Sequence, residues 1–160
     1  MSAYSFRAIT PDDLPMFKAW LAEPHIDGWW GEPGVEARLV EEELGGPRVD
    51  MRLACYDGTP FAFIQDYGAH AFGAPQYEDQ PDDARAIDTF LGNPAYLGQR
   101  HGAGYIAARL AELRARFSRI VTDPDPANTR AIAAYSSAGF RPHDTRPCED
   151  GDLVHVMVHP

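Results

Sequence analysis

The chain has 160 residues, of which 44% are hydrophobic and 24% are charged, and these values exclude a disordered or fibrous protein. Lys and Arg number 14 against 24 Asp and Glu, so the net charge of −10 argues against binding of nucleic acid or an anionic membrane and favours a cationic partner. Cys55 and Cys148 suggest neither a disulfide framework nor a metal site, so we expect no metal. With no apolar run of roughly 18 residues and no secretion signal in residues 1–10, we expect a cytoplasmic protein.

The first third of the chain predicts one strand and two helices. Residues 5–9 have strand character, and the Thr-Pro-Asp-Asp run at 10–13 is typical of a helix start. Apolar side chains at helical spacing continue this helix over 14–21. A second helix is expected over 35–44, where the glycines at 45–46 end it.

The middle of the chain predicts three strands and one long loop. Residues 51–56 and 60–67 form two strand-like runs, and the Asp-Gly-Thr sequence at 57–59 predicts a hairpin turn between them. Residues 68–83 are rich in Gly, Pro and acids without either periodicity, which indicates a loop. Strand character returns over 84–91.

The last third predicts a helix, a strand, a second helix and a hairpin. The strand is expected at 120–121, the second helix from Asn128 to Ala138, and the hairpin strands over 140–146 and 153–158. The first helix is marked by an apolar stripe of Ile106, Leu110, Leu113 and Phe117. We therefore predict one α/β (α+β) domain over residues 1–160, with a mixed, mostly antiparallel sheet of about seven strands and about four helices.

A glycine-rich segment, LGQRHGAGY at 97–105, lies between a predicted strand and a predicted helix. Gly102 and Gly104 allow the backbone to approach a ligand closely, and the free N–H groups of a helix start can bind phosphate. A tight turn with no ligand explains the same glycines equally well. The chain has neither the Gly-Lys-Ser/Thr of an NTPase P-loop nor an N-terminal GxGxxG of a dinucleotide fold.

This segment resembles the signature of the GNAT family of N-acetyltransferases. Gln99, Gly102 and Gly104 match the Q/R-x-x-G-x-G/A pattern, residues 128–139 resemble the second cofactor segment, and the order of elements is similar to that of the family. The resemblance implies acetyl coenzyme A (acetyl-CoA) as the cofactor, with its pyrophosphate on the signature loop. The cofactor-binding residues it implies are Leu91, Tyr96, Leu97, Gln99, Arg100, His101, Gly102, Ala103, Gly104, Asn128 and Tyr135.

Four separated segments, at 25–31, 65–67, 87–88 and 122–124, resemble the aminoglycoside 6'-N-acetyltransferases and their siderophore-acetylating relatives. The resemblance implies that Asp88 acts on the substrate amine, that Tyr135 protonates the leaving thiolate, and that backbone amides near Leu91 hold the thioester oxygen. Together with two acids of the 68–83 loop, the substrate-binding residues predicted are Trp29, Trp30, Gln65, Tyr67, Glu78, Asp79, Asp88 and Asp123.

Elementary chemistry agrees with these roles and limits one of them. Two carboxylates attract a polycation, and a sugar ring can stack on tryptophan. An ordinary Asp, with a pKa near 3.9, is a poor base for an ammonium group whose pKa is several units higher. Proton transfer from the ammonium to the carboxylate costs about 1.4 kcal/mol for each unit of this difference. We therefore expect Asp88 to orient the substrate and to accept the proton with the help of burial or of a water chain.

Other interpretations stay open. Siderophore-acetylating relatives tend to have His where this chain has Asp88, which favours an aminoglycoside-like amine. Two departures from the aminoglycoside enzymes put the substrate in question: the 68–83 loop has no tryptophan, and Gly28 stands where those enzymes often have an acid. A siderophore or lysine-type hydroxylamine is therefore an alternative substrate, and a non-catalytic domain binding acyl-CoA or a cation is an alternative function. An alternative role for Tyr135, Trp29 and Trp30 is packing alone, and an alternative role for Asp123 is to form the turn before Pro124. We expect a monomer or homodimer.

Overall fold

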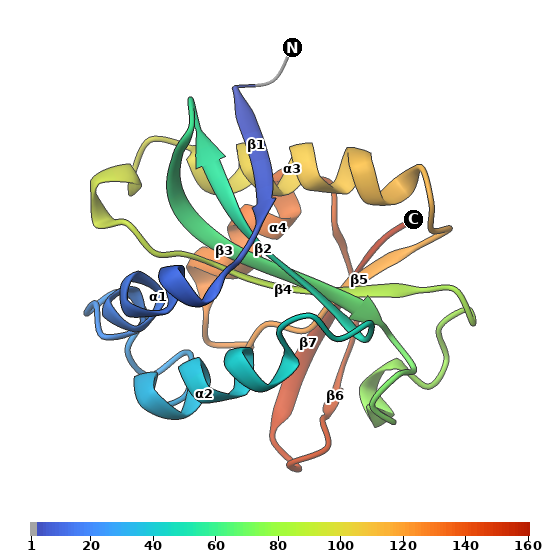
Figure 1. The fold of residues 1–160 in the computed structure, drawn as a ribbon. Helices are drawn as coiled ribbons and strands as arrows, with labels where there is room; N and C mark the ends of the chain where they lie inside the picture. The colour runs from blue at the N-terminus through green and yellow to red at the C-terminus, as the bar shows by residue number, and fades with distance from the viewer. Residues whose placement is uncertain (1–2) are drawn as a thin grey trace. The chain divides into compact units, whose positions relative to one another are not determined.

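Residues 3–160 are described by a computed structural model of the protein (Figure 1), and over these residues the seven strands and four α-helices follow the expected order. Three short 3-10 helices, η1 (Pro11–Asp13), η2 (Pro75–Tyr77) and η3 (Pro94–Tyr96), lie between them. The strands are β1 (Tyr4–Ala8), β2 (Val49–Tyr56), β3 (Thr59–Gly68), β4 (Arg85–Leu91), β5 (Ile120–Thr122), β6 (Arg141–Pro147) and β7 (Leu153–His159). The α-helices are α1 (Leu14–Leu21), α2 (Pro33–Glu43), α3 (His101–Arg114) and α4 (Thr129–Ser137).

The strands form one mixed sheet in the order β1-β2-β3-β4-β5-β7-β6. Strands β4 and β5 are parallel, while β1 and β2, β5 and β7, and β6 and β7 pair antiparallel, as predicted for a mostly antiparallel sheet. The chain divides into two compact units: the first holds the described residues up to Gln65 together with 89–101, and the second holds 66–88 and 102–160. Each unit has its own core.

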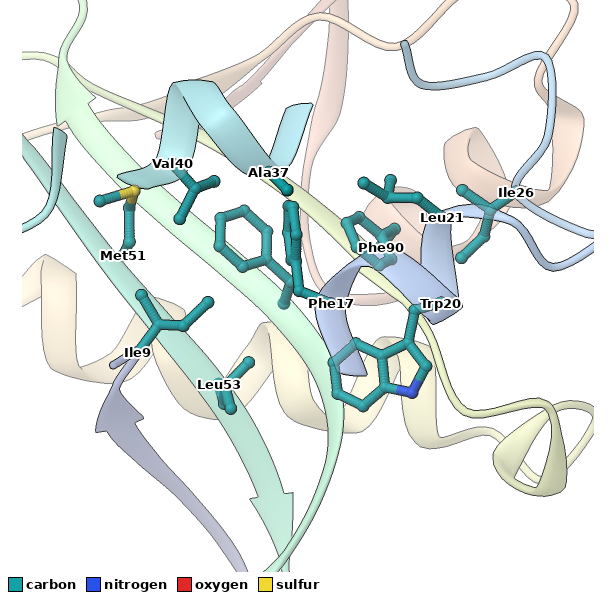
Figure 2. Packing of buried hydrophobic residues seen from close by; sticks show 11 residues of the cluster. Ile9, Phe17, Trp20, Leu21, Ile26, Ala37, Val40, Met51, Leu53 and Phe90 are labelled. Carbon is teal, nitrogen blue, oxygen red and sulfur yellow. The ribbon is translucent and has the colours of Figure 1, made fainter. Parts of the chain in front are cut away.

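The core of the first unit is an aromatic and aliphatic cluster between α1, α2 and strands β2 and β3. Phe17 of α1 is fully buried, and the centroid of its ring lies 4.9 Å from that of Phe63. Figure 2 shows Phe17, Trp20 and Leu21 of α1 among the buried side chains of this cluster, together with Phe90. The predicted amphipathic stripe therefore faces the core, and burial of such side chains stabilises the fold by about 1.5–3 kcal/mol each.

Local sequence signals fix the ends of the elements in this unit. At the start of η1, the carboxylate of Asp13 accepts hydrogen bonds from the backbone N–H and the hydroxyl of Thr10, which completes a capping box. At the β2–β3 turn, Asp57 and Gly58 have φ values of 47° and 85°. Two consecutive positive φ values are what a two-residue hairpin of type I′ requires, so the predicted turn is confirmed.

The core of the second unit is packed around β5 and β7 and contains a buried ion pair. Val121 and Val156 are fully buried. The carboxylate of Asp66 accepts hydrogen bonds from Arg109 at 2.9 Å and from Arg85 at 2.7 Å, and Asp66 is only 2% exposed. This unit therefore buries a charge that two guanidinium groups compensate.

The expected stripe of the third helix was wrong at its last position. Helix α3 ends at Arg114, so Phe117 lies beyond the helix. The Arg114 guanidinium donates to the backbone oxygens of Phe117 and Ser118, which closes the turn after the helix. Within residues 3–160, the helices are all too short or too polar to span a bilayer.

Candidate active site

A group of acidic and phenolic side chains gathers in the second unit where β4 and β5 run parallel. Asp88 lies on β4, two residues after Ala86, which pairs with Val121 of β5. Asp123 directly follows β5. Burial, and then the negative charge of Asp88, raise the pKa of Asp123 to about 7. The two carboxyl groups predicted for the substrate amine are thus close enough to interact.

Two tyrosines surround these carboxyl groups. Burial, followed by the charges of Asp88 and Asp123, raises the pKa of the Tyr67 hydroxyl, which also hydrogen-bonds to Asp88. Tyr77 is fully buried, and burial and the charge of Asp123 raise the pKa of its hydroxyl. Both phenols therefore remain protonated at neutral pH.

Tyr135, the predicted acid, is buried within α4 and is 5% exposed. Burial raises the pKa of the Tyr135 hydroxyl, and hydrogen bonding with Thr122 lowers it. The effect of burial is the larger of the two. The Thr122 hydroxyl in turn donates to the backbone oxygen of Ile87 at 3.0 Å. Tyr135 thus keeps its proton at neutral pH and interacts electrostatically with Asp88 and Asp123.

Helix α4 begins as the sequence predicts. Asn128 is its N-cap, and its side-chain oxygen accepts a hydrogen bond of 3.2 Å from the N–H of Ala131. The oxygen of Asn128 is therefore used in capping, which leaves its amide N–H₂ as the group able to donate to a ligand.

The predicted signature segment has the geometry of a turn leading into a helix. Gly98 and Arg100 have φ values of 73° and 64°, the left-handed region that favours glycine. The Gln99 amide donates to the backbone oxygen of Ala95 at 2.8 Å. His101 to Gly104 form the first turn of α3, whose N–H groups have no partner within the helix and can bind an anion.

In the first unit, His101 belongs to a cluster of rings. Its Nδ1 lies 2.8 Å from the Tyr4 hydroxyl, and its ring centroid is 4.8 Å from that of Tyr56 and 5.2 Å from that of Tyr96. These contacts fix His101, which is the first residue of α3 and itself a predicted cofactor residue.

The two predicted substrate-wall tryptophans differ in exposure. Trp30 packs on the core, with its ring centroid 4.9 Å from that of Phe90 and 6.1 Å from that of Phe63. Trp29 is 45% exposed. Gln65 is half-buried near the end of β3. Trp29 is therefore the ring that is open to a ligand.

The acids of the 68–83 loop also differ. Glu78 is exposed, whereas Asp79 accepts hydrogen bonds from His143 at 2.9 Å and from Arg146. The hydrogen bond from His143 is the main cause that lowers the pKa of Asp79 to about 2. Asp79 thus fastens the loop to β6, and Glu78 is the more available of the two predicted ligands.

Three residues of this site were missed by the sequence analysis. Gln76 donates its amide to the Asp123 carboxylate at 2.9 Å, Tyr77 lies beside the same carboxylate, and the charge of Glu149 acts on both Asp123 and Tyr67. Gln76 and Tyr77 lie on η2, inside a segment expected to be an irregular loop. A single turn beginning at a proline has no periodicity to detect, so only their burial reveals them.

Comparison with known proteins identifies the family. The model of the acetyltransferase (GNAT) domain matches residues 10–147. The chain belongs to the GNAT acetyltransferase family. This GNAT chain is 35% identical to an aminoglycoside N(6')-acetyltransferase type 1 of Klebsiella pneumoniae over 166 residues, with 96% of this chain and 81% of the relative covered. A kanamycin resistance protein of Rhizobium radiobacter is 36% identical over 85 residues, 51% of this chain and 78% of the relative.

Solved GNAT structures give the same result. The aminoglycoside acetyltransferase AAC(6')-Ib in complex with paromomycin and acetyl-CoA superimposes with a TM-score of 0.87 at 31% identity, over 99% of this chain and 93% of that one. AAC(6')-Ib with coenzyme A and kanamycin gives a TM-score of 0.86 at 32% identity, over 97% and 93%. The predicted family resemblance and fold class are both confirmed.

Proposed function

We propose that this GNAT protein transfers the acetyl group of acetyl-CoA to a primary amine of an aminoglycoside, at the 6' position, by direct attack in a ternary complex. The family, the 35% identity to an aminoglycoside N(6')-acetyltransferase and the neighbouring complex with acetyl-CoA support this function. The observation that carries the substrate class is the pairing of Asp88 with the half-buried Asp123. An ammonium group that binds on the solvent side of these two carboxyl groups relieves the repulsion between them.

The residues of the second unit divide the acceptor chemistry between them. Asp123 binds an ammonium group, and Asp88 orients the reacting amine and accepts its proton, directly or through water. The reacting amine attacks the thioester carbonyl in its neutral form, after its ammonium has lost one proton to the solvent. Attack makes the next N–H proton far more acidic, so the weak basicity of a carboxylate suffices to accept that proton. No covalent enzyme intermediate is needed.

The thiolate of coenzyme A leaves as the carbon–sulfur bond breaks. The Tyr135 hydroxyl, protonated at neutral pH, donates a hydrogen bond to the sulfur and supplies the proton. Backbone N–H groups near Leu91 stabilise the thioester oxygen, and the N–H groups in the first turn of α3 bind the pyrophosphate. We assign the cofactor itself to the predicted residues from Leu91 to Gly104, with Asn128 and Tyr135.

The test follows release of the coenzyme A thiol with acetyl-CoA and a panel of aminoglycosides. A kanamycin-type compound with a 6'-amine is expected to turn over, and its analogue with a 6'-hydroxyl is expected not to. Turnover only of hydroxylamine siderophore precursors would replace the proposed substrate. Binding of acetyl-CoA without thiol release for any amine would indicate a non-catalytic binding domain.

A further inference from the structure

Gln76 is a buried amide whose two polar atoms are used unequally. The residue is 3% exposed, and its Nε2 donates to Oδ2 of Asp123 at 2.9 Å. Its Oε1 is buried and has no hydrogen-bond partner among the residues that the structure describes. Rotating the amide by 180° would place Oε1 against the Asp123 carboxylate, where two acceptors repel each other. The orientation with the donor toward Asp123 is therefore kept although it leaves an acceptor unsatisfied.

The backbone that carries Gln76 is held from the other side by β6. Arg146 of β6 donates to the backbone oxygen of Gln76 at 3.5 Å, and it also forms an ion pair with Asp79 at 3.1 Å. His143 binds the same Asp79 carboxylate at 2.9 Å. These contacts fix η2 and so limit where the Gln76 amide can go.

Gln76 and Tyr77 act on the ionisation of Asp123 in the direction opposite to the surrounding acids. Burial disfavours the ionised form of Asp123, and Asp88 from β4 and Glu149 from the turn before β7 add negative charge, so all three raise its pKa. The amide of Gln76 lowers that pKa, as does Tyr77 from the same 3-10 helix. The hydroxyls of Tyr67 from β3 and Tyr135 from α4 also interact with the pair of Asp88 and Asp123.

We propose that Gln76 is a positioning residue of the acceptor-amine site, which favours the ionised form of the Asp123 carboxyl group and holds it in one orientation so that it can receive an ammonium group. The carboxylate has few rotational alternatives while Oδ2 accepts the Gln76 amide, which leaves Oδ1 as the oxygen available to an ammonium group. The role in binding rests on the proposed function, whereas the control of the ionisation of Asp123 does not.

The first experiment is a carboxyl-carbon NMR titration of Asp123 in the full chain, with the signal assigned by its loss in Asp123→Asn. In Gln76→Leu, which keeps the volume and removes the donor, the titration midpoint of Asp123 is expected to rise by roughly one unit. Gln80→Leu is the matched control, because Gln80 is also buried in this loop but its amide donates to Asp79. Its midpoint for Asp123 should stay at the wild-type value.

An unchanged midpoint in a folded Gln76→Leu protein would overturn the inference. Should Gln76→Leu fail to fold, Gln76→Met replaces it, because the methionine side chain is of similar length and has no hydrogen-bond donor, and it must raise the midpoint as well. A midpoint that is equal in Gln76→Met and wild type rejects the proposal.

The second experiment measures kcat/KM for a kanamycin-type amine against pH. In Gln76→Leu the acidic limb should move to higher pH by the same amount as the NMR midpoint, with the KM for acetyl-CoA unchanged; an unmoved limb would reject the role in amine binding. The titration needs no turnover, so the two failures are separate. If Gln76→Leu shifts the Asp123 midpoint but the wild type acetylates no amine, the influence of Gln76 on Asp123 is supported and the proposed function is overturned. If the wild type acetylates the amine but Gln76→Leu leaves the midpoint unshifted, the proposed function is supported and the influence of Gln76 is overturned.

Discussion

His25 and Leu91 are joined by a hydrogen bond of 2.8 Å between Nε2 of the imidazole and the backbone oxygen of the strand residue. A carbonyl oxygen only accepts, so this ring nitrogen carries a proton. The bond ties the segment that contains Trp29 and Trp30 to the end of β4, where we place the thioester oxygen. His25 is thus a link between the predicted substrate wall and the predicted oxyanion contact within the first unit.

Removal of this link should affect both stability and catalysis. His25→Ala is expected to lower the free energy of unfolding by about 1 kcal/mol and to lower kcat, because the end of β4 is less firmly held. His25→Gln, whose amide can donate to the same oxygen, should recover most of the kcat. Urea denaturation and steady-state kinetics measure the two effects, and a kcat equally low in both variants would exclude the hydrogen bond as the cause.

Asp88 is predicted to be essential for turnover. Asp88→Ala should lower kcat at least about a hundredfold through the loss of proton acceptance and orientation, while binding of acetyl-CoA is retained. Asp82→Ala, at an exposed acid in the 68–83 loop, is the control and should keep the wild-type kcat. Near wild-type turnover of Asp88→Ala in the thiol-release assay would remove Asp88 from the mechanism.

Asp123 should be needed for the affinity of the amine. Asp123→Asn is expected to raise the KM for a cationic aminoglycoside and to leave the KM for acetyl-CoA unchanged, because only the ammonium group loses its counter-charge. Equal KM values for the amine in the variant and the wild type would assign Asp123 to the turn before Pro124 alone.

Asp123 also predicts a pH dependence of stability. Its pKa in the folded state, about 7, lies above the ordinary value near 3.9, so the protonated group stabilises the fold fully below about pH 4. That contribution is lost as the pH rises through 7. Between about pH 4 and pH 7, the Tm of the wild type should fall more steeply than that of Asp123→Asn. Parallel profiles of Tm against pH would contradict the expectation.

The ion pair of Asp66 and Arg109 gives a prediction on stability alone. Arg109→Met should lower the free energy of unfolding by about 3–5 kcal/mol, because it takes one of the two guanidinium partners from a carboxylate that is 2% exposed. Asp66→Asn in the same chain should restore part of the loss. Chemical denaturation measures both, and a double variant as unstable as the single one would show that packing, not charge, is responsible.

The elements of the fold were largely predictable because their signals are local. The Thr10 capping box, the Asp57-Gly58 turn and the Asn128 N-cap each act on the backbone within a few residues, so they can be recognised without knowledge of long-range contacts. The end of α3 was less predictable, because the apolar side chain of Phe117 matches the helical spacing although the chain has already turned. The extent of one domain over residues 1–160 and the roles of the site residues stay predictions.

The sequence by itself determined the family, the order of elements and the residues able to carry the chemistry, because motifs and periodicities are properties of neighbouring residues. Only the tertiary structure decided which acids share one environment. Asp88 and Asp123 are 35 positions apart in the chain, and their interaction depends on the pairing of β4 with β5. The tertiary structure also gave Asp79 and Asp123 different hydrogen-bond partners. Asp79 is bound by His143 of β6, whereas Asp123 is bound by Gln76. Burial and charge repulsion arise from atoms that meet in space, so residue types and spacing alone could not reveal them.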